Sequence, residues 1–418
     1  MEIFKIIHTS DWHLGQHFMG KSRQAEHKQF LDWLIANAIE QKVDAIIVAG
    51  DIFDTGSPPS YARELYNQFI VNLQPSGIHL IILGGNHDSV ATLGESKALL
   101  ACLNTHVIPG VLADSHDQVV LLEDAENNAQ AIICAIPYLR PRDLLYSVAG
   151  QSGSEKQQSM QQAISAHYQG IYALAEQQQA AIKKASGYSV PIIATGHLTT
   201  VGAKSSESVR DIYIGTLDAF PSSAFPPADY IALGHIHRPQ LVGGLEHIRY
   251  CGSPIPLSFD ELNNNKIILL VEFKEGQFVA ATPKEVPRFQ AMHLIKGDLN
   301  TIETEIIKLA TQHEPAQPAW LDIEVSAQDY LNDIHQRIQA MVEDLPLEVL
   351  LLRRERKQGL PSIRSEAKET LQELSPKDVF ERRLALEDWS NEALTEKKIR
   401  VSQAFDEVLQ TLIESAES

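Results

Sequence analysis

Residues that commonly bind metal ions follow apolar runs at five places in this chain. They are SDWH at Ser10 to His13, GD at Gly50 to Asp51, GNHD at Gly85 to Asp88, GH at Gly196 to His197, and GHIH at Gly234 to His237. Asp, Asn and His without thiolates suit Mn²⁺, Fe²⁺ or Zn²⁺ in hydrolytic sites. Two such ions can share a carboxylate, acidify a bound water and hold the oxygens of a displacement at phosphorus. The motifs therefore indicate a two-metal phosphoesterase site, with Asp51 as the candidate bridge.

The apolar runs before these motifs predict strands that are buried on both faces of a sheet. The runs are Phe4 to His8, Ala45 to Ala49, Leu80 to Leu83, Ile192 to Thr195, and Tyr230 to Leu233. Ligands in open α/β sheets gather at the carboxyl ends of the strands, so the five motifs are expected to converge. Each motif alone also fits a simple turn or a histidine that packs in the core. Five of them after five strands are hard to explain in that way.

The order D-x-H, GD, GNHD, GH and GHxH resembles the calcineurin-like metallophosphoesterase family. Longer strings resemble, within it, the family of bacterial SbcD nuclease subunits. These strings are HTSDWHLG at His8 to Gly15, GDIFDTGSPPSYAR at Gly50 to Arg63, GNHDSVATL at Gly85 to Leu93, TGHLTTVGA at Thr195 to Ala203, ALGHIHRPQ at Ala232 to Gln240, and RYCGSPIPLSFDE at Arg249 to Glu261. The resemblance implies metal-dependent hydrolysis of phosphodiesters by a β-sandwich that is flanked by helices.

The resemblance also implies two sets of metal ligands that share Asp51. The first metal would be held by Asp11, His13, Asp51 and His237, and the second by Asp51, Asn86, His197 and His235. His87 would protonate the leaving sugar oxygen or steady the charge that develops on the phosphate. Asp54 stands where an Asp orients this His in phosphatases of the superfamily, and a turn-forming Asp54 is the alternative. Asp88 is expected to brace its loop rather than perform chemistry.

The length and the cysteine content of the chain indicate how many domains to expect and in which redox environment the protein works. A chain of 418 residues should hold two or three domains. Cys102, Cys134 and Cys251 form no C-x-x-C pair, so a disulfide framework is not expected and a reducing cytosol fits. An apparent ligand at Asp11 leaves no room for a cleaved leader, and no apolar run reaches membrane-spanning length. We therefore expect a cytoplasmic, nucleoid-associated protein.

The chain is acidic, whereas proteins that bind DNA usually carry a basic surface. The net charge is −19 and the isoelectric point is near 5.3. Two divalent ions would add positive charge where several acids converge, so the pocket itself could attract phosphate. This chain alone is expected to bind DNA weakly, and a partner is expected to provide most of the contacts with DNA. Candidate contacts to the DNA backbone, with ordinary surface or salt-bridged arginines as the alternative, are Arg140, Arg142, Arg210, Arg238 and Arg249.

Four segments are predicted along this α/β chain. They are a phosphoesterase domain at 1–275, a small α/β capping domain at 285–353, a linker at 354–374, and C-terminal helices at 375–418. Within the first, helices are expected at Glu26 to Glu40 and Ser60 to Leu73, and a loop leading into a solvated helix at Gly150 to Gly187. The cap is predicted as strand, helix, strand, helix, strand, with helices over Thr301 to Thr311 and Tyr330 to Val342. By resemblance, it would cover the active site and help to select DNA ends.

The last segment starts with Ser375 before Pro376, a good helix start. It then carries an apolar stripe of Val401, Phe405, Val408, Leu409, Leu412 and Ile413 at helical spacing. The stripe fits packing on the chain's own core or docking on a partner. The resemblance favours docking on the coiled-coil base of an SbcC-like ATPase of the SMC family, in an assembly with two copies of each chain.

The resemblance thus implies a manganese-dependent DNA nuclease subunit that processes double-stranded ends and hairpins in replication, recombination and repair. The sequence has no Gly-rich nucleotide loop followed by Lys-Ser/Thr, so ATP hydrolysis is expected in the partner. One alternative is a phosphoprotein or cyclic-nucleotide phosphoesterase with the same metal site. Another is a scaffold whose metals only shape an assembly surface. Metal-dependent turnover, and competition between hairpin DNA and a phosphopeptide, would separate these functions.

Overall fold

The computed structural model describes residues 3–144, 152–206, 208–209, 219–326 and 333–354, together with Arg400 and Phe405. The chain divides into two compact units, residues 1–354 and 355–418. The predicted linker and, apart from Arg400 and Phe405, the predicted terminal helices lie outside the described residues, as does Arg210. The domain boundaries near 275 and 285 fall inside the first unit and remain predictions.

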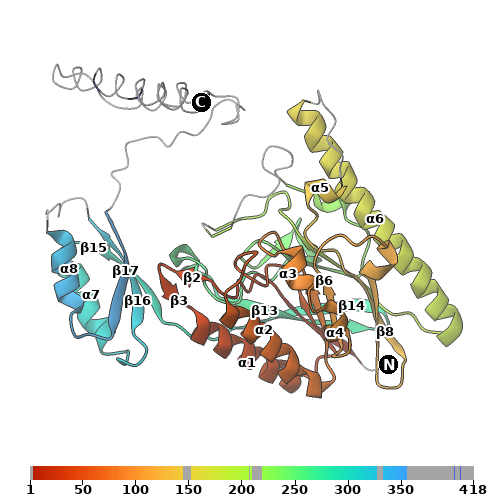
Figure 1. Cartoon of the computed structure of the whole chain (residues 1–418), viewed down its shortest axis with the longest axis horizontal. Helices are drawn as coiled ribbons and strands as arrows, with labels where there is room; N and C mark the ends of the chain where they lie inside the picture. Colours follow the sequence, from red (N-terminus) through yellow and green to blue (C-terminus); the bar gives the residue numbers. More distant parts are fainter. Residues whose placement is uncertain are drawn as a thin grey trace. The chain divides into compact units, whose positions relative to one another are not determined.

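Two six-stranded sheets pack face to face in the first unit (Figure 1). The first has the order β14 (Gln277–Glu285), β13 (Ile267–Lys274), β1 (Phe4–Thr9), β4 (Ala45–Val48), β5 (His79–Leu83) and β6 (Thr105–Ile108). The second has the order β11 (Gln240–Val242), β12 (Leu245–Tyr250), β10 (Tyr230–Gly234), β9 (Ile192–His197), β8 (Ala129–Cys134) and β7 (Val119–Glu123). The five predicted strands are present, three in one sheet and two in the other. Within each sheet they run parallel.

Successive side chains of each strand point to opposite faces of the sheet, and both faces are buried, which explains why these runs are apolar throughout. In β4, Ala45 and Ile47 face the second sheet, whereas Ile46 and Val48 face the helices that cover the first. A strand that is buried on both faces needs apolar residues at every position. The predicted class, an α/β protein with a calcineurin-like sandwich, is confirmed.

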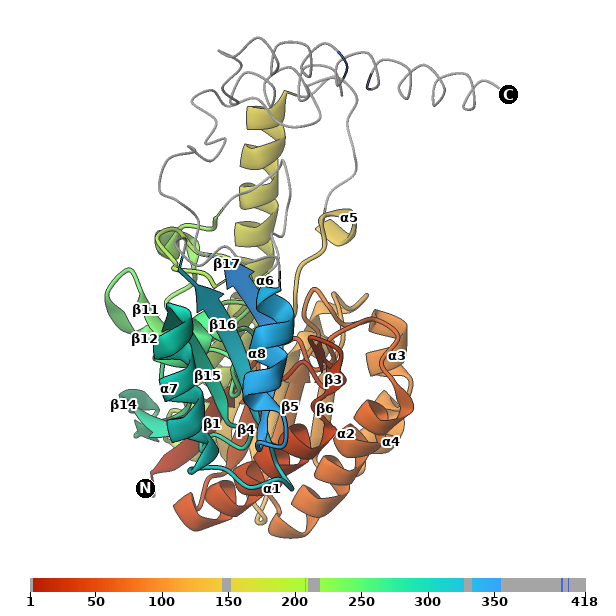
Figure 2. The same ribbon diagram turned by 90° about the vertical axis from the view of Figure 1, so that its left-hand side faces the viewer.

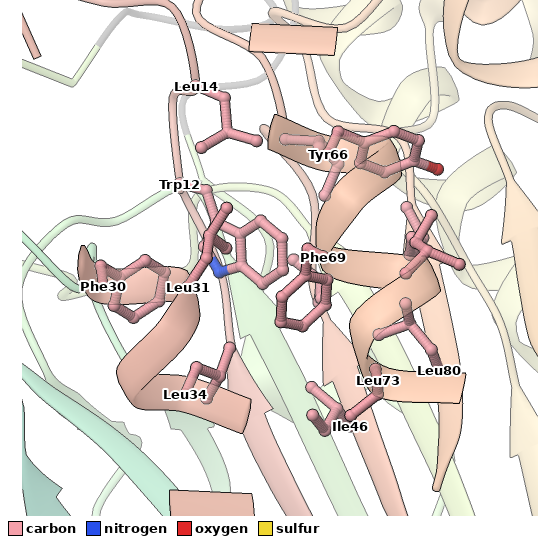
Figure 3. Packing of buried hydrophobic residues seen from close by; sticks show 14 of the residues in the cluster. Trp12, Leu14, Phe30, Leu31, Leu34, Ile46, Tyr66, Phe69, Leu73 and Leu80 are labelled. Atoms are coloured by element: carbon pink, nitrogen blue, oxygen red, sulfur yellow. The ribbon is translucent and has the colours of Figure 1, made fainter. Parts of the chain in front are cut away.

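Helices cover the outer faces of both sheets. Helices α1 (Gln24–Gln41) and α2 (Ser60–Leu73) pack on the first sheet and enclose Trp12 between Phe30 and Phe69 (Figure 3). Both helices match their predictions within two residues. Shorter helices are α3 (Val90–Gly94), α4 (Lys97–Ala101) and α5 (Pro141–Leu144).

Helix α6 (Gly153–Ser186) covers the second sheet and corrects one expectation. The segment was expected to be a loop leading into a solvated helix, but it is helical from Gly153. One face is buried through Met160, Ile164, Tyr168, Ile171 and Ala175. The spacing of three and four residues between these side chains makes one continuous stripe, which the surrounding Gln and Ser residues obscure.

The last part of the first unit is a three-stranded parallel sheet with two helices. Its elements are β15 (Met292–Gly297), α7 (Leu299–Ala310), β16 (Ala319–Val325), α8 (Ile334–Val342) and β17 (Leu347–Arg354). Both helices lie on one face of this sheet (Figure 2). On the other face Trp320 stacks on Phe18 of the hairpin β2 (His17–Phe18) and β3 (Lys21–Ser22), with ring centroids 5.6 Å apart. Lys21 also pairs with Glu348 at 2.9 Å, so the first unit continues through Arg354.

Among the described residues, no helix has both the length and the apolar character that crossing a bilayer requires.

Candidate metal centre

The structure brings the seven predicted ligands together at the carboxyl ends of β1, β4, β5, β9 and β10. Three groups have ligand atoms within 4.8 Å of one another: Asp11 with His13 and His237 (the first group), Asp51 with His197 and His235 (the second group), and His13 with Asp54 and His87. Asn86 joins the second group, because its Oδ1 lies 2.9 Å from His197 Nε2 and 3.1 Å from His235 Nδ1. The first and second groups contain residues of the two metal sets that the resemblance implies, and their assignment to metal ions remains a prediction.

Asp51 lies between the two groups. Its Oδ2 is 3.2 Å from His197 Nε2 and 3.7 Å from His13 Nε2. Its Oδ1 accepts a hydrogen bond from the main-chain N–H of His87 at 2.9 Å. One oxygen is therefore held by the GNHD loop while the other faces imidazoles of both groups, as a bridging carboxylate requires.

Sharp backbone turns aim the ligands into the site. Asp11, His13, Asp51 and His235 all have left-handed conformations, with φ values of 53°, 47°, 51° and 92°. Such conformations are uncommon for residues other than glycine and are found where the surroundings impose them. Trp12 supplies part of that constraint between the first two ligands: it is fully buried, with ring centroids 5.8 Å from Phe30 and 5.2 Å from Phe69 (Figure 3).

Two glycines allow neighbouring strands to approach. A Cβ at Gly85 would lie 2.1 Å from Asp51 Oδ1. At Gly50, where φ is +93°, a Cβ would lie 2.2 Å from His197 Nδ1. The glycines in the GD and GNHD motifs are thus required by the closeness of the ligands, in addition to any role in turning the chain.

The residues present fit divalent cations. His13 Nε2 and His235 Nε2 are buried and make no hydrogen bond, which is costly unless a further group is bound. Asp51 and His197 each stabilise the charged form of the other. Burial would lower the pKa of His197, but the charge of Asp51 outweighs it and raises this pKa to about 9. Burial would raise the pKa of Asp51, and the charge of His197 instead holds it well below the usual value.

His87 and Asp54 lie beside the first group, where their ligand atoms and those of His13 are within 4.8 Å of one another. The Nδ1 atom of His87 lies 2.8 Å from the main-chain carbonyl of Asp54. The Asp54 carboxylate lies 3.2 Å from Nδ1 of His13. Sequence reasoning assigned the orienting role to the Asp54 side chain. Every residue type has a main-chain carbonyl, so the sequence alone could not predict this contact.

Asp88 and Arg140 hold the GNHD loop. The Asp88 carboxylate accepts hydrogen bonds from the main-chain N–H groups of Ile52, Phe53 and Gly85, at 3.1, 2.9 and 2.8 Å. Burial and the neighbouring charge of Asp51 raise the pKa of Asp88 to about 6. Arg140 donates to the carbonyl of Asp88 at 2.8 Å, so this candidate DNA contact braces the loop.

Of the other described candidate arginines, Arg142 and Arg249 make contacts typical of surface groups, whereas Arg238 has a buried Nε that makes no hydrogen bond. Arg142 pairs with Asp143 at 3.6 Å with its side chain largely exposed. Arg249 Nε donates to the carbonyl of Glu246 at 2.7 Å. Neither contact places the guanidinium on the metal ligands, so neither adds to the case for contact with DNA.

Glu261 and Lys266 are buried residues behind His237 that the sequence analysis missed. Glu261 Oε1 lies 3.4 Å from His237 Nδ1, and Lys266 Nζ lies 2.5 Å from Glu261 Oε2. Burial would raise the pKa of Glu261, but the hydrogen bond with His237 and the charge of Lys266 keep it far below its usual range. Glu261 is the last residue of the family-like string RYCGSPIPLSFDE, but the sequence analysis gave this residue no role.

Comparisons with protein families match both parts of the chain. A model described as calcineurin-like phosphoesterase matches residues 4–239. A second model, the SbcD C-terminal one, described as the type 5 capsule protein repressor C-terminal domain, matches residues 288–388. The first match contains all seven candidate ligands, together with His87 and Asp54.

Relatives with a curated name are similar over most of their length. The chain is 53% identical to the D subunit of nuclease SbcCD from Escherichia coli over 409 residues, which cover 98% of both chains. It is 32% identical to the protein of the same name in Rhodobacter capsulatus, over 82% of this chain and 85% of that one. In Bacillus subtilis the identity is 28%, over 79% and 82%.

Proposed function

Because this chain belongs to the calcineurin-like phosphoesterases and, within them, to the SbcD nuclease subunits, we propose that it hydrolyses DNA phosphodiesters at the site around Asp51. The observation that carries this proposal is the meeting of two buried ligand groups at one carboxylate. The chain would be a double-strand exonuclease and a hairpin endonuclease, acting in replication, recombination and repair. Such a subunit would work at the nucleoid in the cytoplasm.

We infer that the site holds two Mn²⁺ ions, which its donor set fits. Asp11, His13, Asp51 and His237 would hold one, and Asp51, Asn86, His197 and His235 the other. When bound, two such ions supply Lewis-acid polarisation of the phosphate and a more acidic water. Oxygen and imidazole donors without thiolates suit Mn²⁺ in a hydrolytic site.

His87 is the residue we assign to the leaving oxygen. Its Nδ1 donates to the carbonyl of Asp54, which fixes the ring and makes Nε2 the nitrogen that exchanges a proton with the substrate. The main-chain N–H of His87 holds Asp51, so the same loop positions the acid and the bridging ligand. Asp54 supports this arrangement through its carbonyl and, at His13, through its carboxylate.

The chain would act with an ATPase partner. Its relatives are each named as one subunit of the nuclease SbcCD, and its own net charge of −19 is unsuited to gripping DNA alone. We infer an SbcC-like SMC-family ATPase as the partner, two copies of each chain including a self-dimer, and double-stranded ends and hairpins as substrates.

Metal-dependent turnover on competing substrates tests the proposal. The purified full-length chain is stripped with a chelator, reloaded with Mn²⁺, and given labelled hairpin DNA in competition with a phosphopeptide or a cyclic nucleotide. We expect cleavage of the hairpin that requires Mn²⁺ and is lost in Asp51→Ala. Preference for the phosphopeptide or the cyclic nucleotide would instead support the alternative phosphoesterase function, and no turnover on any substrate would support the scaffold.

A further inference from the structure

Glu261 is a carboxylate without access to solvent that joins three segments behind the metal centre. It is 1% exposed. Its Oε1 accepts from the hydroxyls of Ser206, at 2.8 Å, and Ser208, and its Oε2 accepts from the N–H of Leu257 at 3.0 Å and from Lys266 at 2.5 Å. A buried charge is retained only when it is paired and hydrogen-bonded to this degree.

These contacts converge on His237. The Nδ1 atom of His237 lies 2.6 Å from Ser208 Oγ and 3.4 Å from Glu261 Oε1. Lys266 also donates to the main-chain carbonyl of His237 at 3.1 Å. Both the ring and the backbone of this ligand are therefore held by the same pair of charged residues.

The outward nitrogens of the other ligands have different partners. His13 Nδ1 faces the carboxylate of Asp54 at 3.2 Å, and His197 Nδ1 lies 2.9 Å from the carbonyl of Ala49. A carboxylate behind a metal-binding imidazole fixes its tautomer and increases its basicity, and its loss typically weakens metal binding by about 10–100-fold. Both histidines of the Asp11 group thus have a carboxylate partner, whereas His197 in the other group has a neutral carbonyl.

We propose that Glu261, held by Lys266, is a positioning residue that presents His237 Nε2 to the metal ion of the Asp11 group. The inference rests on the proposed two-metal function and adds a residue that lies outside the ligand set. The competing explanation is that Glu261 only braces the segment from Ser253 to Leu257, because it also accepts from both of those residues. The two explanations differ in what they predict for metal affinity.

The test is Glu261→Gln in the full chain, titrated with Mn²⁺ by calorimetry and followed by electron paramagnetic resonance. Gln keeps the shape and an acceptor oxygen but removes the charge. A matched control is Asp322→Asn, which also neutralises a buried carboxylate paired with a cation, Arg353, but in the sheet of β15–β17. Thermal unfolding of each variant without metal records the structural cost separately.

We expect Glu261→Gln to bind one of the two Mn²⁺ ions about 10–100-fold more weakly, with loss of the spin-coupled two-ion signal at limiting metal. Asp322→Asn should bind both ions as the wild type does. Wild-type affinity for both ions in Glu261→Gln would overturn the inference and leave the proposed function standing. A wild-type chain that binds fewer than two ions would overturn the proposed function, and the inference with it.

A second variant keeps the test decisive if Glu261→Gln does not fold. Lys266→Met leaves the carboxylate in place but removes its cation and the contact with the His237 carbonyl. We expect this change to weaken the same ion, because the carboxylate is no longer fixed. Unchanged binding of both ions by a folded Lys266→Met chain would contradict the proposed role of the pair.

Discussion

The imidazole Nδ1 of His87 lies 2.8 Å from the main-chain carbonyl of Asp54, while the carboxylate of the same Asp54 lies 3.2 Å from His13. One residue therefore serves two histidines through different atoms. A substitution of Asp54 removes the carboxylate but leaves the carbonyl that accepts from His87.

We expect His87→Ala to retain both metal ions and to lose about 10²–10⁴ in cleavage rate, the range for a positioned acid. Asp54→Ala keeps the acceptor for His87 and should lose less rate, but it should bind metal more weakly because His13 loses its carboxylate partner. Metal analysis and single-turnover cleavage of hairpin DNA on the same preparations check both. Equal metal affinity in Asp54→Ala and the wild type would count against the His13 contact.

Asp51→Ala should lose metal occupancy and abolish cleavage, because its carboxylate faces imidazoles of both groups. Asp88→Asn is the matched control on the same loop. It replaces an oxygen that accepts main-chain N–H groups with an amide donor, which should destabilise the fold by about 1–3 kcal/mol while both ions stay bound. Elemental analysis of the purified variants measures occupancy, and two ions retained by Asp51→Ala would refute the bridging role.

Gly85→Ala should inactivate the site without unfolding the sheets. The added methyl would lie 2.1 Å from Asp51 Oδ1, so the GNHD loop or the bridging carboxylate must move. Gly77→Ala is the control, because its Cβ meets nothing within 4 Å although its φ is also positive at +74°. Circular dichroism and metal analysis compare the two variants. Wild-type occupancy in Gly85→Ala would show that the loop relaxes freely.

His8 should make the apoprotein sensitive to acid. It joins the two sheets through Tyr230 Oη at 2.9 Å and the Leu233 carbonyl at 3.2 Å, and burial lowers its pKa from 6.5 to about 3. The unfolded chain therefore binds the proton more readily between these values. Stability should fall as pH drops below about 6.5, by roughly 1.4 kcal/mol per pH unit from this group.

Urea unfolding of the metal-free chain at pH 7 and pH 5 measures that loss. The His8→Gln chain has no titrating group at this position, so its stability should depend less steeply on pH than that of the wild type. Parallel pH profiles for the two chains would show that His8 does not carry the effect.

A chain that ends at Leu374 should stay folded, bind two metals and hydrolyse a small model phosphodiester. The ligands all lie in the first compact unit, and the division falls between Arg354 and Glu355. We expect this chain not to co-purify with the proposed ATPase partner and to lose ATP-stimulated cleavage of duplex ends. Phe405→Glu combined with Leu412→Glu should act in the same way. If the truncated chain unfolds, the apolar stripe belongs to the protein's own core.

The sequence was sufficient to predict which side chains meet, because each candidate ligand lies at or just after the end of a strand. Strand ends and ligand residue types are both local features, and parallel pairing brings the ends together. The division of the five strands between two sheets was not visible, since a doubly buried run looks the same in either sheet. Glu261 and Lys266 could not be assigned roles for a related reason. They act on His237 only through the folding of the segments around it, and no residue spacing encodes that contact.

The ligands Asp11 and His235 are 224 positions apart in the chain, yet the N–H of His235 donates to the Asp11 carboxylate at 2.9 Å. A contact between such distant residues requires the closure of a long loop. A nascent chain that has not reached the GHIH motif lacks two of the seven ligands and cannot complete either group. During translation the metal centre therefore stays incomplete until more than half of the chain has been made.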